Sequence, residues 1–171
     1  MPTVLTHPVV AIALAPWLRR HGVDPRVIVT GMLCTLVPDL DVIGLRLGIP
    51  YDAPLGHRGF SHSLAFATLL AGLLATLGAR LWAGVSRPLA FAFFFVCTAS
   101  HGVLDAMTTG GHGIAFFAPF SNERHFLPWR PIEVSPLSIR SFLSARGFGV
   151  LASELRWLVL PAALVSAAGW I

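Results

Sequence analysis

The sequence predicts an all-α membrane protein: a polytopic helical bundle with about five membrane-embedded helices and one structured long loop. Three observations support this fold class. Hydrophobic residues make up 55% of the 171 residues and charged residues only 12%, which is far more apolar than a typical soluble domain. Apolar runs of helical length recur along the chain. Proline and glycine gather in residues 108–147, which we expect to form an extramembrane loop within one domain covering residues 1–171.

The first two apolar runs are short for membrane spans. We expect one helix from about Pro8 to Leu18, with Thr6 as its N-cap, and a second from Val27 to Val37. Pro38 should kink or end the second run, although apolar residues continue to Leu47.

The later runs are the clearer spans. Ser63–Val85 and Leu89–Met107 each approach the roughly 20 residues that cross about 30 Å of hydrocarbon. A last run extends from Phe148 to Ile171, and Pro161 is expected to bend it.

Composition and motifs argue against several function classes. All 12 basic residues are arginines, and a net charge of +4 spread over short loops is more typical of residues that set membrane topology than of nucleic-acid binding. We therefore expect no nucleic-acid partner. Cys34 and Cys97 lie in apolar runs without a redox or metal-binding spacing, so we interpret them as core residues. The chain also lacks GxSxG, P-loop, HExxH and Rossmann motifs.

Histidines and aspartates gather at helix ends that an up-and-down bundle would place on one side. The expected metal ligands are His7 before the first helix, Asp39 and Asp41 after the second, His57 and His62 before the third, and His101 and Asp105 at the end of the fourth. His21 is expected to be solvated at the opposite end, and the loop residues His112 and His125 stay unassigned.

Local spacing supports a metal site but leaves alternatives open. His101 and Asp105 are four residues apart, so one helix face presents both to a cation, although a simple buried His–Asp hydrogen bond gives the same pattern. Asp39 and Asp41 could instead be solvated acids at a helix end, and Asp39 is the better ligand candidate because it lies closer to the helix.

The segment "GHRGFSHS" adds two imidazoles. Gly59 would allow an unusual turn between His57 and His62, and Ser61 could cap the third helix. Which histidine binds more directly stays open, with His62 slightly favoured because the helix fixes it. Imidazole with carboxylate and without cysteine suits one or two divalent ions, Zn²⁺ first and Mn²⁺ or Fe as alternatives, in a catalytic site.

The motifs "TH", "PDLD", "HRGFSHS", "HGVLD" and "PFSNERHFLPWRPIEVSP", spread over residues 6–136, resemble the LexA-regulated membrane-bound metal-dependent hydrolases, also called YdjM-like. That family is distantly similar to zinc-dependent phospholipase C. The resemblance implies a phosphoester hydrolase in which Asp105 bridges two metals and Asp39 is both ligand and base. The residues that complete a third metal site in phospholipase C have no clear counterpart here.

We therefore expect a membrane-bound hydrolase that uses metal-activated water on the phosphoester of a lipid or lipid-linked substrate. Asp39 and Arg58 are the expected catalytic residues, and Arg58, Arg124 and Arg130 are the expected ligands of phosphate oxygens. Membrane lipids are the expected partners, and the oligomeric state is left open. The alternative is a divalent-metal-binding membrane protein or transporter, but the ligands gather at one end beside a loop rather than along a mid-membrane path.

The distribution of arginines predicts the orientation. Short loops away from the candidate site are dense in arginine, namely Arg19, Arg20, Arg26, Arg80 and Arg87. Positive charge in short loops favours the cytoplasmic side. We therefore expect an integral protein of the bacterial inner membrane whose site faces outward.

Overall fold

The computed structural model describes residues 1–78, 81–82, 84–136 and 139–171. Helices dominate this part of the chain, and its extended pairing is limited to two isolated bridges, Thr108 with Ile132 and Ile114 with His125. The all-α fold class is therefore confirmed for the described residues.

Two short helices begin the fold. Helix α1 spans Val9–Arg20 and α2 spans Pro25–Cys34. Asp24 caps α2 by accepting a hydrogen bond from the backbone N–H two residues later, at 2.8 Å. The prediction that Thr6 caps α1 is wrong, because the Thr6 hydroxyl donates to the carbonyl of Thr3 instead.

The chain changes direction after α2, as Pro38 predicts. The 3-10 turn η1 (Val37–Asp41) and the short helix α3 (Val42–Arg46) follow, and α2 makes an angle of 41° with them. Pro38 lies in the first turn of η1, where a missing N–H removes no hydrogen bond. This break places Asp39 at the end of the helical bundle.

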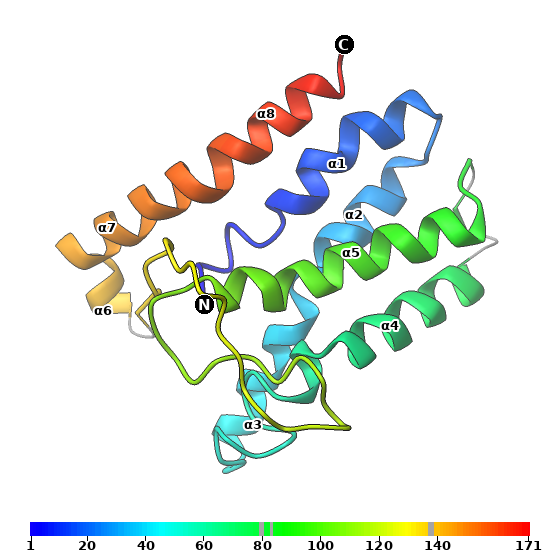
Figure 1. The fold of residues 1–171 in the computed structure, drawn as a ribbon. Coiled ribbons are helices and arrows are strands. Elements are labelled where there is room, and N and C mark those ends of the chain that lie inside the picture. Colours follow the sequence, from blue (N-terminus) through cyan, green and yellow to red (C-terminus); the bar gives the residue numbers. More distant parts are fainter. Residues whose placement is uncertain (79–80, 83, 137–138) are drawn as a thin grey trace.

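Helices α4 (Leu64–Leu77) and α5 (Arg87–Ala106) form an antiparallel pair (Figure 1). Buried alanines recur every four residues along one face of α4, which allows close helix packing. These alanines are Ala67, Ala71 and Ala75. Phe93, Phe94 and Cys97 of α5 complete the core together with Val27 of α2.

The C-terminal helices begin inside the predicted loop. Helix α6 spans Ile139–Phe142, and α7 (Ala145–Glu154), the π turn η4 (Leu155–Val159) and α8 (Leu160–Ala168) then form one continuous stretch. The π turn precedes Pro161, which has no N–H to donate to the preceding turn. Helix α8 packs along α1 (Figure 1).

Two helical stretches in the described part of the chain are long and apolar enough to cross a membrane, α5 and 145–168. The bent pair of α2 with η1 and α3 would be a third span. Helices α1 and α4, with 12 and 14 residues, are about 18 and 21 Å long, less than the roughly 30 Å hydrocarbon core. The expected five membrane-embedded helices are therefore not confirmed. The predicted run 63–85 also includes positions 79, 80 and 83, which lie outside the described residues.

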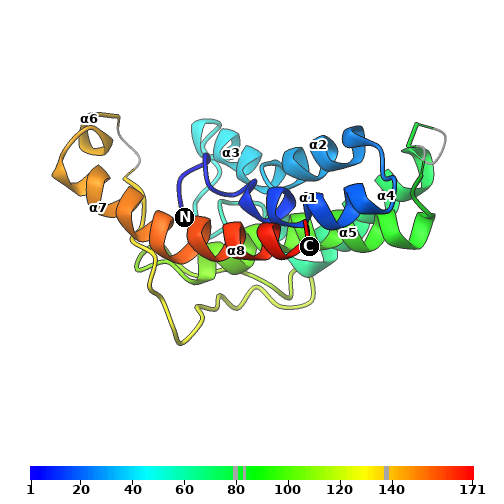
Figure 2. The ribbon, with the colours of Figure 1, turned by 90° about the horizontal axis from the view of Figure 1, so that it is seen from above.

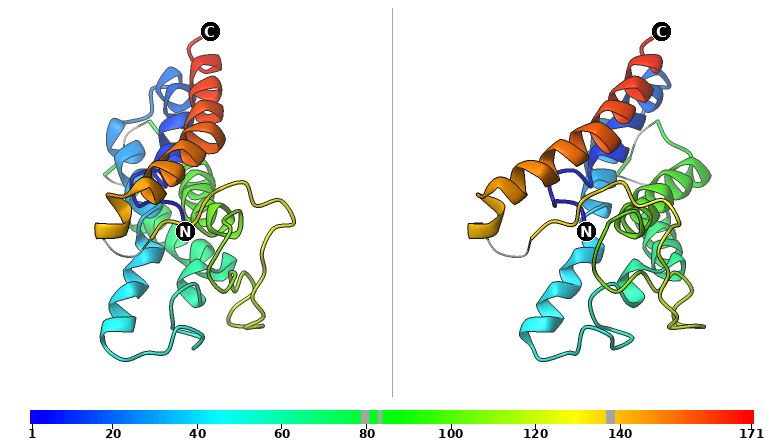
Figure 3. Two further views of the ribbon diagram at one scale, coloured as in Figure 1. Left: turned by 90° about the vertical axis from the view of Figure 1, so that its left-hand side faces the viewer. Right: turned by 60° about the vertical axis from the view of Figure 1, so that its left-hand side comes forward.

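The long loop lies at one end of the helices. Viewed from above, the helices form a flattened layer and the loop that follows α5 extends from one side of it (Figure 2). The N-terminus lies beside the C-terminal end of α5, whereas the C-terminus lies at the far end of the molecule (Figures 1 and 3). This arrangement brings the N-terminal segment, η1 and the end of α5 together.

Candidate metal centre

The structure brings all seven predicted ligands into three overlapping groups. Within each group, one potential ligand atom per residue lies within 4.8 Å of the others. The groups are His7, His101 and Asp105; Asp39, His62 and His101; and Asp41, His57 and His62. The predicted convergence of four helix ends is therefore present in the fold.

His62 and His101 are both anchored at Nδ1, which leaves Nε2 facing the cluster. Nδ1 of His101 donates to the carbonyl of Thr35 at 2.7 Å, so Nε2 of a neutral ring has a free lone pair. Nδ1 of His62 lies 3.1 Å from Oδ2 of Asp41. The two Nε2 atoms are 3.1 Å apart. A hydrogen bond at the far ring nitrogen is the usual way in which proteins orient metal-binding histidines.

Asp39 completes a triangle with these nitrogens. Its Oδ1 lies 3.3 Å from Nε2 of His101 and 3.7 Å from Nε2 of His62. Zinc–nitrogen bonds of 2.0–2.1 Å imply a separation of about 3.4 Å between the ligand atoms of a tetrahedral site. Both carboxylate oxygens of Asp39 are buried, and neither makes a hydrogen bond within the part of the chain that the structure describes. The spacing and the unused lone pairs therefore fit a small divalent cation.

His7 and Asp105 form a second buried pair beside His101. Nε2 of His7 lies 3.7 Å from Oδ1 of Asp105, and the His7 ring stacks on His101 with 3.9 Å between centroids. Both side chains are fully buried, yet among the described residues neither ring nitrogen of His7 nor either oxygen of Asp105 makes a hydrogen bond. Buried polar atoms without hydrogen bonds are rare and destabilising, and a cation would satisfy the oxygen lone pairs of Asp105 and the one lone pair of a neutral His7 ring.

Arg58 is enclosed beside this pair. Its Nε lies 3.1 Å from Oδ2 of Asp105, and its guanidinium donates to the carbonyl of Gly110 at 3.0 Å. Arg58 is only 1% exposed, and its backbone adopts a φ of 65°. Gly111 makes room for it, because a Cβ there would lie 2.2 Å from Nη1 of Arg58. The structure thus places Arg58 against Asp105 and the start of the long loop.

His57 and Asp41 are already hydrogen-bonded to their surroundings. Nδ1 of His57 lies 2.6 Å from Oδ1 of Asp41, while Oδ2 accepts from the hydroxyl of Ser61 at 2.6 Å and from the backbone N–H of Arg58 at 3.1 Å. Ser61 therefore does not cap α4 as expected; Ser63 does, by accepting from the backbone N–H three residues later.

The turn between the two histidines differs from the expected one. The left-handed residue is Arg58 rather than Gly59. Gly59 is needed for space, because a Cβ would lie 2.4 Å from the carbonyl oxygen of Pro54.

The site's electrostatics favour neutral His7 and a positive charge near His62. Burial and the neighbouring His101 lower the pKa of His7 to about 3, so at neutral pH one of its ring nitrogens keeps an available lone pair. Burial also acts to lower the pKa of His62, but the nearby carboxylates of Asp39 and Asp41 outweigh it and raise the pKa to about 9. The carboxylates around His62 thus favour a cation at this point.

The other predicted arginines lie around the long loop. Arg124 donates to the carbonyls of His57 and Tyr51, both at 3.0 Å, and so ties the loop to the segment that carries His57. Arg130 is exposed and lies over the Phe126 ring, with 4.8 Å between Cζ and the centroid.

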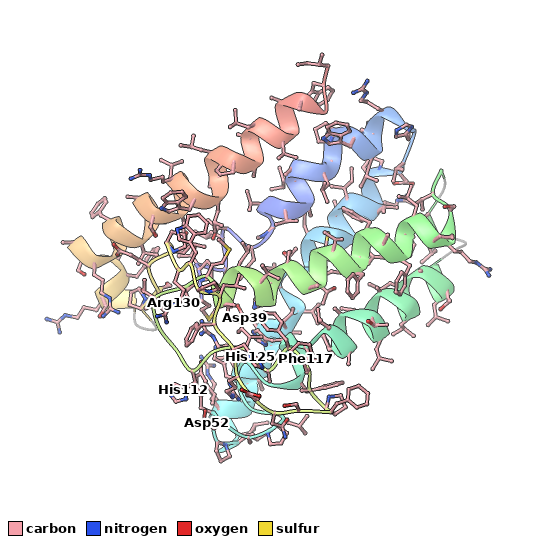
Figure 4. All side chains as sticks on the ribbon, in the orientation of Figure 1. Asp39, Asp52, His112, Phe117, His125 and Arg130 are labelled. Carbon is pink, nitrogen blue, oxygen red and sulfur yellow. The ribbon has the colours of Figure 1, made fainter. Side chains whose placement is uncertain are left out.

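Two loop histidines that the sequence left unassigned have partners. Nδ1 of the exposed His112 lies 2.7 Å from Oδ1 of Asp52, and His125 makes an edge contact with Phe117 (Figure 4). Sequence reasoning missed the Asp52–His112 pair because the two residues are 60 positions apart in loops without periodicity.

Comparison with known proteins supports an inner-membrane location. A family model described as "YdjM inner membrane protein" matches residues 1–171. The curated protein "Inner membrane protein YbcI" of Escherichia coli (strain K12) is 37% identical over 171 residues, which covers 99% of this chain and 98% of the relative. No solved structure matches the chain.

Proposed function

Because the chain belongs to the YdjM inner membrane protein family, we propose that its buried ligand cluster works at a membrane, as the centre of a metal-dependent hydrolase. One observation carries the proposal: among the described residues, buried polar atoms of His7, Asp39 and Asp105 make no hydrogen bond and lie within the ligand groups, although Arg58 forms an ion pair with Asp105. An inert bundle would gain stability by replacing such groups with apolar ones. Their presence supports a bound divalent cation, Zn²⁺ first and Mn²⁺ or Fe as alternatives.

Asp39, His62 and His101 are the proposed ligands of one ion, and Asp105 with His7 extends the centre toward a second. Such a cation lowers the pKa of a water molecule and offsets negative charge on a leaving oxygen. Asp39, which is 11% exposed at its side chain, is the proposed acceptor of the water's proton. Asp41 orients His57 through a hydrogen bond, and its other oxygen lies 3.1 Å from Nδ1 of His62.

The proposed substrate is a phosphoester of a lipid or lipid-linked molecule, which membrane embedding and the resemblance to phospholipase C both favour. In the reaction, water attacks phosphorus, the phosphorus–oxygen ester bond breaks, and the leaving oxygen receives a proton. Arg58 acts on Asp105, because its guanidinium is enclosed there. Arg124 and the exposed Arg130 are the remaining candidates for binding phosphate oxygens. We also propose that the centre faces outward.

The test is a metal-depletion assay on the full chain purified in detergent. Metal is removed with a chelator, Zn²⁺ or Mn²⁺ is restored, and turnover of phospholipids and chromogenic phosphodiesters is measured. We expect turnover only with metal and a loss of at least 100-fold in His101→Ala, since each metal ligand is needed for transition-state stabilisation. His21→Ala, at the opposite end of α1, is the matched control and should behave like the wild type.

The outcomes separate the two function classes. Metal-dependent turnover that disappears in His101→Ala supports the hydrolase. Stoichiometric metal binding without turnover of any phosphoester would overturn the hydrolase and leave a metal-binding protein or transporter, and no metal binding at all would overturn both.

A further inference from the structure

Glu154 is a buried acidic residue outside the proposed metal centre. It is the last residue of α7, directly before the π turn η4, inside the continuous helical stretch 145–168 that is long enough to cross a membrane. Its side chain is 1% exposed. A carboxyl group in an apolar helix is costly unless it is paired, and such groups are usually functional. π turns inside helices are also frequent at functional positions.

Within the described part of the chain, both hydrogen bonds to the Glu154 side chain come from Thr3, at the other end of the sequence. The Thr3 hydroxyl donates to Oε2 at 2.7 Å, and the Thr3 backbone N–H donates to Oε1. Thr3 is itself buried. These two hydrogen bonds hold the N-terminal segment against the end of α7. Figure 1 shows this segment between α5 and the α7–α8 stretch.

The anchored segment carries His7. The N–H of Thr6 donates to the carbonyl of Thr3 at 3.0 Å, and the N–H of Val9 donates to the carbonyl of Thr6 at 3.0 Å. The Thr6 hydroxyl adds a bond to the carbonyl of Thr3 at 3.1 Å. These successive turns form a hydrogen-bonded path from Glu154 to the start of α1, and His7 lies within it.

His7 needs such support more than the other histidines of the cluster. His62 and His101 are each oriented by a partner at Nδ1, whereas neither ring nitrogen of His7 makes a hydrogen bond to any described residue. The position of the His7 ring therefore depends on its backbone and on stacking against His101. Metal-binding histidines otherwise gain their orientation from a hydrogen bond to the second ring nitrogen.

We propose that Glu154 is a positioning residue for His7: by binding Thr3, it fixes the N-terminal segment so that His7 faces Asp105 and the metal centre. This inference rests on the proposed function, because it assigns His7 to that centre. The contact would link the end of α7 to the proposed ligand His7, just before α1.

The test measures metal affinity and segment order separately. Zn²⁺ dissociation constants are obtained by competition with a chromophoric chelator for the wild type, Glu154→Ala, Glu154→Gln, Thr3→Val and His7→Ala. We expect Glu154→Ala to weaken binding by about 10–100-fold, as is typical when a group that orients a ligand is lost. Thr3→Val should give a smaller loss in the same direction, and Glu154→Gln should restore part of the affinity because its amide oxygen can still accept. Glu123→Ala, which removes an exposed carboxylate from the long loop, is the control and should have no effect.

A double variant distinguishes positioning from general destabilisation. If Glu154 acts through His7, Glu154→Ala combined with His7→Ala should bind Zn²⁺ no more weakly than His7→Ala alone. Additive losses, or unchanged affinity in folded Glu154→Ala, would overturn the proposal. Should Glu154→Ala fail to fold, the pair Thr3→Val and Thr3→Val with His7→Ala gives the same comparison.

Hydrogen exchange tests the contact between Glu154 and Thr3 without requiring a bound metal. Amide exchange over residues 3–8 of the metal-free protein should accelerate at least tenfold in Glu154→Ala, while exchange in α4 and α5 is unchanged. Faster exchange together with absent Zn²⁺ binding in the wild type would overturn the metal centre while showing that the anchor exists. Unchanged exchange would overturn the anchor itself.

Discussion

Arg58 combines a left-handed backbone with a buried charge that lies against the Asp105 carboxylate. The side chains of Arg58 and Asp105 are 1% and 0% exposed. Removing one member of a buried pair leaves the other charge without compensation. A φ of 65° is unfavourable for a residue with a Cβ, and contacts of Arg58 with Asp105 and Gly110 act against that strain.

We therefore predict that Arg58→Met destabilises the protein by about 3–5 kcal/mol. Adding Asp105→Asn should recover part of this loss, because the uncompensated charge is then removed. Chemical unfolding in detergent, followed by tryptophan fluorescence, measures both variants. Equal stability of Arg58→Met and the wild type would show that the Arg58–Asp105 pair adds nothing to the free energy of unfolding.

The Asp52–His112 pair sets a pH dependence at the surface. The hydrogen bond from His112 lowers the pKa of the exposed Asp52 carboxyl below its usual value. Because the folded pKa is lowered, the pair's stabilising effect is fully present above the unfolded pKa of about 3.9 and is lost as the pH falls through the folded value.

In His112→Ala we expect the titration midpoint of Asp52 to rise toward about 3.9. Carbon-13 NMR of aspartate-labelled protein in detergent measures the midpoint, with His21→Ala as the control. The effect on stability should be small, because solvent screens exposed pairs. An unchanged midpoint in His112→Ala would contradict the assigned interaction.

At the residue scale, the sequence identified which side chains converge but not which atoms form hydrogen bonds. His7, His62, His101 and Asp105 could be named because helix ends carry them. That Asp41 bonds to His57 and Ser61, or that Glu154 holds Thr3, depends on segments meeting across the fold. An acidic residue within an apolar run was a visible signal for Glu154, since such residues are rarely incidental.

At the scale of elements, the close contact between α2 and α5 depends on Gly31. A Cβ at Gly31 would lie 2.4 Å from Cε1 of Phe93 and 3.1 Å from Sγ of Cys97. Both neighbours are buried in the core and have little room to move. The glycine therefore sets how closely the two helices approach.

We predict that Gly31→Ala destabilises the protein by about 1–3 kcal/mol through overpacking, although alanine is the better helix former. Gly72→Ala in α4 is the matched control, since the nearest heavy atom to its added Cβ is 4.0 Å away. That variant should be neutral or more stable by up to about 1 kcal/mol. Thermal unfolding of the two variants in one detergent compares them, and equal destabilisation would contradict the packing argument.

Some boundaries of helices and turns can be predicted from the local sequence alone. The 20 residues of α5 and the turn at Pro38 follow from apolar length and proline chemistry. The caps of α1 and α4 were assigned wrongly because Thr6 and Ser61 found other hydrogen-bond partners in the folded chain. Several serines or threonines near a helix start are locally equivalent, and tertiary contacts select among them.

At the scale of the whole molecule, α1 runs from the side of the proposed centre to the opposite side. His7 precedes α1 and His21 follows it. Arg19, Arg20 and Arg26 lie at the His21 end, whereas Arg80, which also entered the orientation argument, falls outside the described residues. Arginine-rich short loops favour the cytoplasmic side.

We predict that the His21 end is cytoplasmic and that the long loop faces outward. In His21→Cys and Glu123→Cys, a membrane-impermeant maleimide applied to intact cells should label only Glu123→Cys, and both should react after permeabilisation. Both native cysteines are buried and provide a low background. Labelling of His21→Cys alone in intact cells would reverse the proposed orientation.

The sequence by itself determined the membrane class, the helical fold and the set of side chains available to bind a cation, because apolar length and residue chemistry are properties of short segments. Only the tertiary structure decided which apolar runs are long enough to span, which atoms of those side chains meet, and that Arg58 and Glu154 support the site from within the protein. Those outcomes depend on contacts between residues as distant as Thr3 and Glu154. The free energy of such contacts exists only when packing brings the segments together, so no local pattern specifies them.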